Sequence, residues 1–143
     1  MSNIRIFVSH RIDIDSETVD TPVYFPVRCG AVYDEEGNSE IQGDDTGDNI
    51  SKLRMSFCEF TVQYWAWKNV DADYYGLCHY RRYLSFSDKR YKNTVFNMVR
   101  ELKLTPHEKK KYHLDDTKKI EKTVKQYDMI IPVVAKASEM SYN

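Results

Sequence analysis

The order of strand-like and helix-like segments constrains the fold of this chain most strongly. Three segments rich in β-branched and apolar residues alternate with two helical patterns along the sequence. In chain order these five segments cover residues 4–9, 57–68, 74–79, about 115–126 and 129–134. Strands that alternate with helices form a mostly parallel sheet with helices packed on it. The sequence therefore predicts an α/β fold.

The helical pattern over residues 57–68 is the clearest local signal. Ser56 and Glu59 form an S-x-x-E sequence just before the apolar run, which is typical of a capping box at a helix start. Aromatic residues then follow at steps of three and four and so share one face, namely Phe57, Phe60, Tyr64 and Trp67. We expect both tryptophans, Trp65 and Trp67, to pack in the core. A stacking platform for a sugar or a base is the alternative for them.

Two further helices are predicted with less support from the pattern. A short helix is expected near residues 94–102. Asp115 or Asp116 is expected to cap the helix that runs to about Gln126, with Ile120, Val124 and Tyr127 on one face. The continuous apolar run over residues 129–134 is typical of a strand buried on both faces.

Composition excludes several classes of protein. The chain has 143 residues, which suits a single domain with its own core. Its net charge of −1 gives no overall field that would select nucleic acid. The three cysteines have no C-x-x-C spacing, so neither a zinc site nor a disulfide framework is expected. The opening residues are too polar for a signal peptide, and no apolar run approaches the ~20 residues of a membrane span. We expect a cytoplasmic protein, at most peripheral to the inner face of the membrane.

The charges are unevenly distributed along the chain. Residues 1–88 hold 15 acidic residues against 8 lysines and arginines, whereas residues 89–125 hold 12 lysines and arginines against 5 acidic residues. We interpret the basic segment as a solvated face of helices and loops. An acidic partner or a lipid surface is the alternative.

Polar side chains follow two of the predicted strands at the point where each ends. Ser9 and His10 end the first strand, and His79, Arg81 and Arg82 end the one over residues 74–79. In open parallel sheets, ligands bind beyond the carboxyl ends of the strands. The sequence therefore places a candidate site at this edge.

The segment HYRRY, residues 79–83, carries the sharper chemical signal. Guanidinium groups suit a diphosphate because two donors meet two oxygens at once. A pair of structural ion pairs is an equally weighted alternative for Arg81 and Arg82, and a buried structural role is the alternative for His79.

The acidic segment GDDTGDNIS, residues 43–51, has more than one interpretation. Asp44, Asp45 and Asp48 could bind a divalent cation or a ligand. The same side chains could instead structure the loop or pair with arginines, and this is the favoured interpretation. The spacing fits neither an EF-hand nor a phosphate-binding P-loop.

Six segments in this order carry a resemblance to a known family. They read IFVSH, PVYFPVRCGA, GDDTGDNIS, FCEFTVQYWAWKN, DYYGLCHYRRYL and YDMIIP, and they extend over nearly the whole chain. The chain resembles the DUF4422 family of bacterial glycosyltransferase-like proteins associated with capsular and exopolysaccharide synthesis.

The resemblance implies a fold and a reaction class. The family is similar to GT-A nucleotide-sugar transferases, so a Rossmann-like sheet and the transfer of a hexose from a UDP-sugar are expected. The implied acceptor is a growing capsular, exopolysaccharide or lipopolysaccharide glycan, or a lipid-linked oligosaccharide. A divalent cation, Mn²⁺ or Mg²⁺, is the candidate cofactor.

The matching positions define the candidate site residues. The catalytic candidates are His79, Arg81 and Arg82. The substrate-binding candidates are Asp44, Asp45, Asp48 and Asn49, together with His10 from the first strand. We expect Arg81 or Arg82 to replace or assist a metal in neutralising the leaving UDP.

Two departures from the family pattern affect what can be expected. Relatives usually read Glu-Lys-Asn where this chain has Lys52-Leu53-Arg54. Family domains also continue past the YDMIIP segment. Residues 1–143 are therefore expected to form the nucleotide-sugar-binding half of a longer domain, and a truncated, non-catalytic binding remnant is the alternative.

Overall fold

The chain folds into two compact units. A computed structural model describes residues 2–37, 40–91, 94–95, 98–99 and 104–132. The first unit spans Met1–Tyr80 and the second spans Arg81–Asn143. Each unit is described by itself below.

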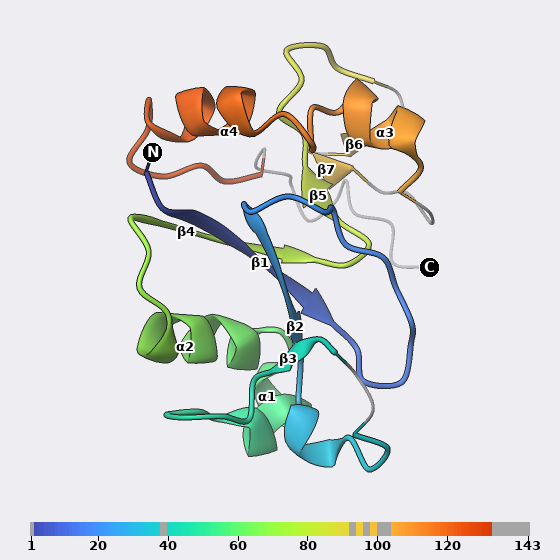
Figure 1. Ribbon diagram of the computed structural model, residues 1–143, viewed down its shortest axis with the longest axis vertical. Coiled ribbons are helices and arrows are strands. Elements are labelled where there is room, and N and C mark those ends of the chain that lie inside the picture. Colours follow the sequence, from blue (N-terminus) through green and yellow to red (C-terminus); the bar gives the residue numbers. More distant parts are fainter. Residues whose placement is uncertain (1, 38–39, 92–93, 96–97, 100–103, 133–143) are drawn as a thin grey trace, which may run out of the picture. The chain divides into compact units, whose positions relative to one another are not determined.

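The first unit is built on a four-stranded parallel sheet (Figure 1). Its strands are β1 (Ile4–His10), β2 (Tyr24–Arg28), β3 (Gln42–Gly43) and β4 (Tyr74–His79), in the order β3-β2-β1-β4. His10 lies opposite Arg28 on β2, and Ser9 lies opposite His79 on β4. The carboxyl ends of the three longer strands therefore meet at one edge, which confirms the predicted α/β fold.

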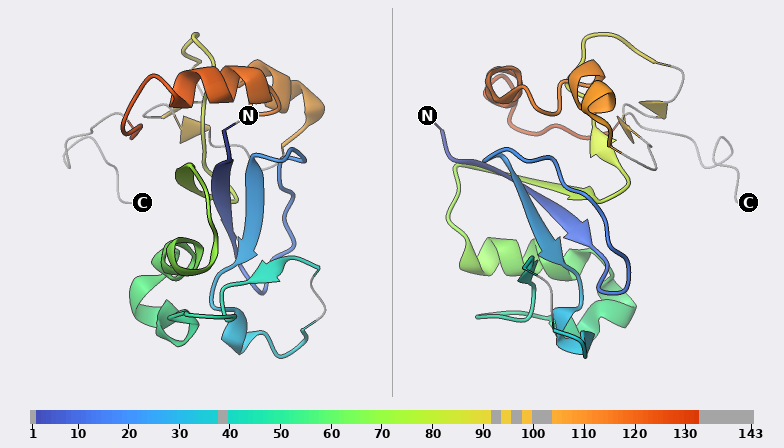
Figure 2. Two further views of the ribbon diagram at one scale, coloured as in Figure 1. Left: turned by 60° about the vertical axis from the view of Figure 1, so that its left-hand side comes forward. Right: turned by 45° about the vertical axis from the view of Figure 1, so that its right-hand side comes forward.

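One helix covers a face of this sheet. Helix α2 (Phe60–Asn69) lies along the strands (Figures 1 and 2). Its buried side chains are Thr61, Val62, Trp65 and Ala66. The core cluster contains three of these residues, Val62, Trp65 and Ala66. They pack against Phe7, Val27 and Cys29 from the sheet side. The Trp65 ring stands edge-on to Phe7, with 6.4 Å between ring centroids.

The predicted start and buried face of this helix are wrong. Ser56 lies inside a separate one-turn helix, α1 (Arg54–Phe57), and Cys58 breaks the path with a φ of 46° before α2 begins. Glu59 makes no capping hydrogen bond through its side chain. Phe57, Phe60 and Trp67 are exposed. The face that meets the sheet is one residue further round the helix, so Trp65 is in the core and Trp67 is not.

Two short 3₁₀ helices complete the first unit. They are η1 (Ala31–Tyr33), which follows β2, and η2 (Ser51–Leu53), which precedes α1. The Tyr33 hydroxyl donates to the Lys52 carbonyl at 2.7 Å, and Ser51 Oγ accepts from the Val32 amide. These bonds hold the two short helices together.

The second unit contains a small antiparallel sheet and two helices. Strands β5 (Tyr83–Leu84), β7 (Met98–Val99) and β6 (Thr94–Val95) lie in that order, and α3 (Pro106–Lys111) and α4 (Thr117–Val124) follow. The helix predicted near residues 94–102 is therefore wrong in its described part, where two strands pair instead. Asp116 caps α4 as predicted, since its carboxylate accepts from the Lys119 amide at 3.0 Å.

Helix α3 was not predicted, although its sequence carries a start signal. The Thr105 hydroxyl accepts from the Glu108 amide at 3.2 Å, and Pro106 occupies the first turn. Thr-Pro-x-Glu is thus a capping sequence in which proline replaces an amide that needs no partner. In the part of the chain that the structure describes, no helix is long and apolar enough to cross a bilayer.

The apolar run after α4 does not form the predicted strand in its described part. Met129 to Pro132 have no strand assignment, and Met129, Ile130 and Ile131 are exposed. Val133 and Val134 lie outside the described residues. Since a strand is stabilised by its hydrogen-bonded neighbours, an apolar sequence alone does not produce one.

Candidate functional site

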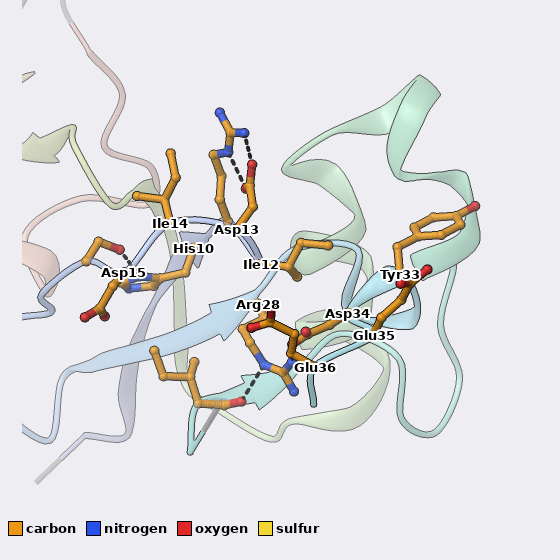
Figure 3. Close-up of a pocket in the computed structure, with 13 residues that line it drawn as sticks. His10, Ile12, Asp13, Ile14, Asp15, Arg28, Tyr33, Asp34, Glu35 and Glu36 are labelled. Carbon is orange, nitrogen blue, oxygen red and sulfur yellow. Dashed lines mark hydrogen bonds and ion pairs between the residues drawn. The ribbon is translucent and has the colours of Figure 1, made fainter. Parts of the chain in front are cut away.

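A pocket of about 720 Å³ opens at the carboxyl ends of β1 and β2 (Figure 3). One wall is the loop that leaves β1, and the other is the segment after η1. The lining residues are His10, Arg11, Ile12, Asp13, Ile14, Asp15, Ser16, Arg28, Tyr33, Asp34, Glu35, Glu36 and Ile41. This is the edge where parallel sheets bind ligands, and the size is within the range of small-molecule sites.

His10 fixes the loop wall of the pocket. Its Nδ1 lies 2.5 Å from Ser16 Oγ, and its Nε2 lies 2.6 Å from Thr18 Oγ1. The ring also stacks on Tyr80, with 5.9 Å between centroids. Burial, helped by the nearby His79, lowers the pKa of His10 to about 4. The imidazole is therefore neutral at pH 7, with both nitrogens occupied, and it positions the loop.

This geometry predicts an acid-sensitive stability. The folded pKa of about 4 lies below the ordinary 6.5, so the unfolded chain takes up the proton first as the pH falls. The contribution of neutral His10 to the free energy of unfolding is complete above pH 6.5 and is lost as the pH falls from 6.5 to 4. The loss reaches about 3 kcal/mol at pH 4. Urea unfolding followed by tryptophan fluorescence at pH 7, 5.5 and 4.5 measures the change.

The variant His10→Gln is the control for this pH step. It keeps hydrogen-bonding groups in the ring's place but cannot be protonated, so the difference in stability from the native chain should shrink as the pH falls. Carboxylates titrate equally in both proteins. A difference that does not depend on pH would contradict a neutral, buried His10.

The pocket is acidic as a whole. Five carboxylates and two guanidinium groups line it. Both arginines already have partners: Arg11 pairs with Asp13, and Arg28 pairs with Asp34 and donates to the Ile41 carbonyl at 3.0 Å. The hydrogen bond from Arg11 lowers the pKa of Asp13. A pocket with this charge favours a neutral group rich in hydroxyls over a bare phosphate.

Asp44 is a buried anchor at the start of η1. Its side chain is fully buried. It accepts four hydrogen bonds, from the Gly30 and Ala31 amides at 2.9 Å each and from the Ser51 and Thr61 hydroxyls at 2.5 Å each. The carboxylate thereby joins η1, η2 and α2, which supports the loop-structuring interpretation of this residue.

The remaining residues of GDDTGDNIS shape the loop to different degrees. Asp48 accepts from the Tyr64 hydroxyl at 3.0 Å, and Asn49 donates to the Asp45 and Gly47 carbonyls at 3.0 Å. The Asp45 side chain is exposed and has no hydrogen bond with a described residue. None of the four substrate-binding candidates in this segment lines the pocket.

The predicted catalytic residues lie around the end of β4. His79 Nε2 is 3.6 Å from a carboxylate oxygen of Glu59 at the start of α2. The chain turns at Tyr80 and Arg81 directly after the strand, and the side chains of Arg81 and Arg82 are exposed. Arg82 has no ion pair with the part of the chain that the structure describes.

Most of the pocket was missed by reasoning from the sequence. Of the predicted residues only His10 lines it, whereas Arg11, Asp13, Asp15 and Arg28 were not selected. The position of residues 11–16 directly after a strand end was a usable signal. Their composition, however, is that of an ordinary surface loop and gave no reason to select them.

Metal binding has no preformed cluster here. Among the described residues, no group of three or more histidine, cysteine, aspartate or glutamate side chains is placed to hold a metal ion. The role of Mn²⁺ or Mg²⁺ therefore stays a prediction.

Comparison with known proteins identifies the relatives of this fold. The model of DUF4422, a domain of unknown function, matches residues 5–143. Among solved structures, the apo structure of WbbM, a bifunctional glycosyltransferase, matches with a TM-score of 0.66 and 34% identity. The match covers 78% of this chain and 20% of that chain, so the chain spans about a fifth of its length. No curated protein matches. The chain therefore belongs to the DUF4422 family, and its structure is glycosyltransferase-like.

Proposed function

We propose that the chain is the nucleotide-sugar-binding half of a glycosyltransferase. The reaction is the transfer of a hexose from a UDP-sugar to a capsular, exopolysaccharide or lipopolysaccharide glycan. The observation that carries this proposal is the 720 Å³ pocket at the carboxyl edge of a parallel sheet, in a chain 34% identical to part of a glycosyltransferase. The donor sugar, acceptor and glycan pathway are parts of the proposal.

In this proposal the pocket holds the nucleoside. Uracil and ribose are uncharged and rich in hydrogen-bonding groups, which suits an acidic lining. Asp15 accepts from the ribose hydroxyls, and so do the remaining lone pairs of the two Asp13 oxygens, each of which also accepts from Arg11. Tyr33 is 49% exposed beside the pocket and offers its ring to the base.

The diphosphate needs positive charge from outside this lining. Arg81 and Arg82 are exposed and follow β4 directly, and we assign the phosphates to them, with a divalent cation as a further source of charge. Asp45 is the member of the acidic segment with a carboxylate available for such a cation or for the sugar. His79, held near Glu59, is assigned to the reacting end of the donor.

Calorimetric titration of the chain with UDP and UDP-sugars, with and without Mn²⁺, tests the proposal. We expect one-site binding that the double variant Asp13→Asn/Asp15→Asn weakens about tenfold or more, because two charged acceptors for the ribose become weaker neutral amides. The matched control Glu17→Gln/Asp20→Asn removes the same charge from the same loop outside the pocket. Absence of nucleotide binding, or equal loss in both variants, would contradict the proposal.

A binding module without activity is the second candidate. The observation that favours it is the pocket, because it could bind a nucleoside whether or not a reaction follows. Saturable UDP-sugar binding with no release of UDP in the presence of glycan acceptors would support the module. Turnover by the chain itself would support the enzyme.

A further inference from the structure

The loop that leaves β1 is fastened back onto the end of that strand by one histidine. The His10 ring contacts Ser16 Oγ through Nδ1 at 2.5 Å and Thr18 Oγ1 through Nε2 at 2.6 Å. The two hydroxyls lie six and eight residues further along the chain. The ion pair between Arg11 and Asp13 lies within the loop and does not tie it to the strand. His10, Ser16 and Thr18 thus form a clasp.

The ring of the clasp is itself held in place. His10 is buried, and its ring stacks on Tyr80. Its carbonyl accepts from the Cys29 amide at 2.8 Å. Cys29 directly follows β2, so this bond fixes the end of β1 against its neighbour in the sheet. The ring therefore gives the loop a fixed point of attachment.

Each hydroxyl of the clasp has a definite partner. A neutral imidazole offers one donor and one acceptor, so one hydroxyl accepts from the ring and the other donates to it. Removal of either hydroxyl leaves a buried ring nitrogen without its partner, which costs free energy. The loop can reduce this cost by moving away from the ring so that water reaches the nitrogen. Loss of one hydroxyl should therefore loosen the loop.

The clasped loop carries the two carboxylates assigned to the ribose. Asp13 and Asp15 line the pocket from this loop (Figure 3), and Asp15 directly precedes Ser16. Thr18 is not one of the residues that line the pocket. Groups that are held in their binding positions before a ligand arrives raise its affinity, because less freedom is lost on binding. Thr18 can therefore affect a ligand in the pocket without contacting it.

We propose that Thr18 is a positioning residue for nucleotide binding, and that it acts through His10 on the loop that presents Asp13 and Asp15. Ser16 has the same role at the other ring nitrogen. Because Ser16 also lines the pocket, Thr18 gives the cleaner test. The inference rests on the proposed function, in which the two carboxylates accept from the ribose hydroxyls.

Calorimetric titration of the full chain with UDP tests the role of Thr18. The variant Thr18→Val keeps the shape of the side chain but loses the hydroxyl, and it should raise the Kd about fivefold or more. The variant Thr18→Ser keeps the hydroxyl and should stay within about twofold of the native Kd. The matched control is Thr21→Val. The Thr21 hydroxyl is buried without a hydrogen-bond partner among the described residues, so its loss should leave the Kd unchanged.

Trypsin digestion reports on the loop itself, with no nucleotide present. Arg11 is exposed in the loop, so the bond that follows it is a site of cleavage when the loop opens. Cleavage there is followed by mass spectrometry, under conditions where circular dichroism shows each variant to be folded. The rate should rise several-fold in Thr18→Val and stay at the native value in Thr18→Ser and Thr21→Val.

The outcomes separate this inference from the proposed function. Native affinity in Thr18→Val, equal loss in Thr21→Val, or no recovery in Thr18→Ser would overturn the role of Thr18 and leave nucleotide binding itself intact. An unchanged rate of cleavage after Arg11 in Thr18→Val would overturn it as well. Absence of UDP binding by the native chain would count against the proposed function, and against this inference with it.

Discussion

Replacing Asp44 by alanine is expected to lower the free energy of unfolding of the first unit by about 4 kcal/mol. The substitution leaves two backbone amides and two hydroxyls without their acceptor in a fully buried place. An orphaned buried polar group costs about 1–3 kcal/mol. The two hydroxyls can rotate, and Thr61 already has the Cys58 carbonyl at 3.1 Å as a second acceptor. The expected loss of unfolding free energy is therefore smaller than four such costs added together.

Urea unfolding followed by tryptophan fluorescence measures this loss. Both tryptophans of the chain, Trp65 and Trp67, belong to the first unit, so the signal reports that unit. The neighbouring variant Asp45→Ala is the control, and its effect should stay within about 0.5 kcal/mol because the side chain is exposed. Similar midpoints for the two variants would show that Asp44 is not the anchor.

The largest expected effect on catalysis comes from the two arginines. In a longer family member that carries the HYRRY sequence, alanine at the position of either Arg81 or Arg82 should lower turnover by ~100-fold or more. This is the scale observed when one preorganised donor to a developing charge is removed. The reason is that the pocket lining is acidic, so the leaving diphosphate depends on cations from elsewhere.

The control for this prediction separates catalysis from stability. Lysine at each position keeps the charge but loses the two-pronged geometry, so it should recover part of the activity. Melting temperatures of all variants should stay near the native value, since both side chains are exposed. Intact turnover together with a lower melting temperature would make the arginines structural and the mechanism wrong.

The sequence predicted strands β1 and β4 well because their signals were local. Residues 4–9 and 74–79 are short apolar stretches bounded by polar residues, and both became strands within one residue of the expected limits. The matching ends also pointed to the edge of the sheet where the pocket lies. The helix after β3 was harder, because the Cys58 kink depends on the contacts of residues distant in sequence and not on the local pattern.

The composition of the pocket could not be predicted in the same way. The role of Asp44 depends on amides from η1 and hydroxyls from η2 and α2, and these meet only in the folded unit. Conversely, Asp13 and Arg28 line the pocket because of their positions in the fold. Asp13 lies in the loop after β1, and Arg28 lies at the end of β2. The apolar run over residues 129–132 shows that a local pattern alone does not predict a strand. Its pattern favours a strand, but no described segment pairs with it.

A crystal structure of the chain with bound UDP tests the central claim most directly. We expect the uracil and ribose in the pocket lined by residues 10–16 and 33–36, with ribose hydroxyls within hydrogen-bonding distance of Asp13 or Asp15. We expect the diphosphate to point out of the acidic lining. A nucleotide bound elsewhere on the chain, or its phosphates buried among Asp34, Glu35 and Glu36 without a cation, would contradict the account.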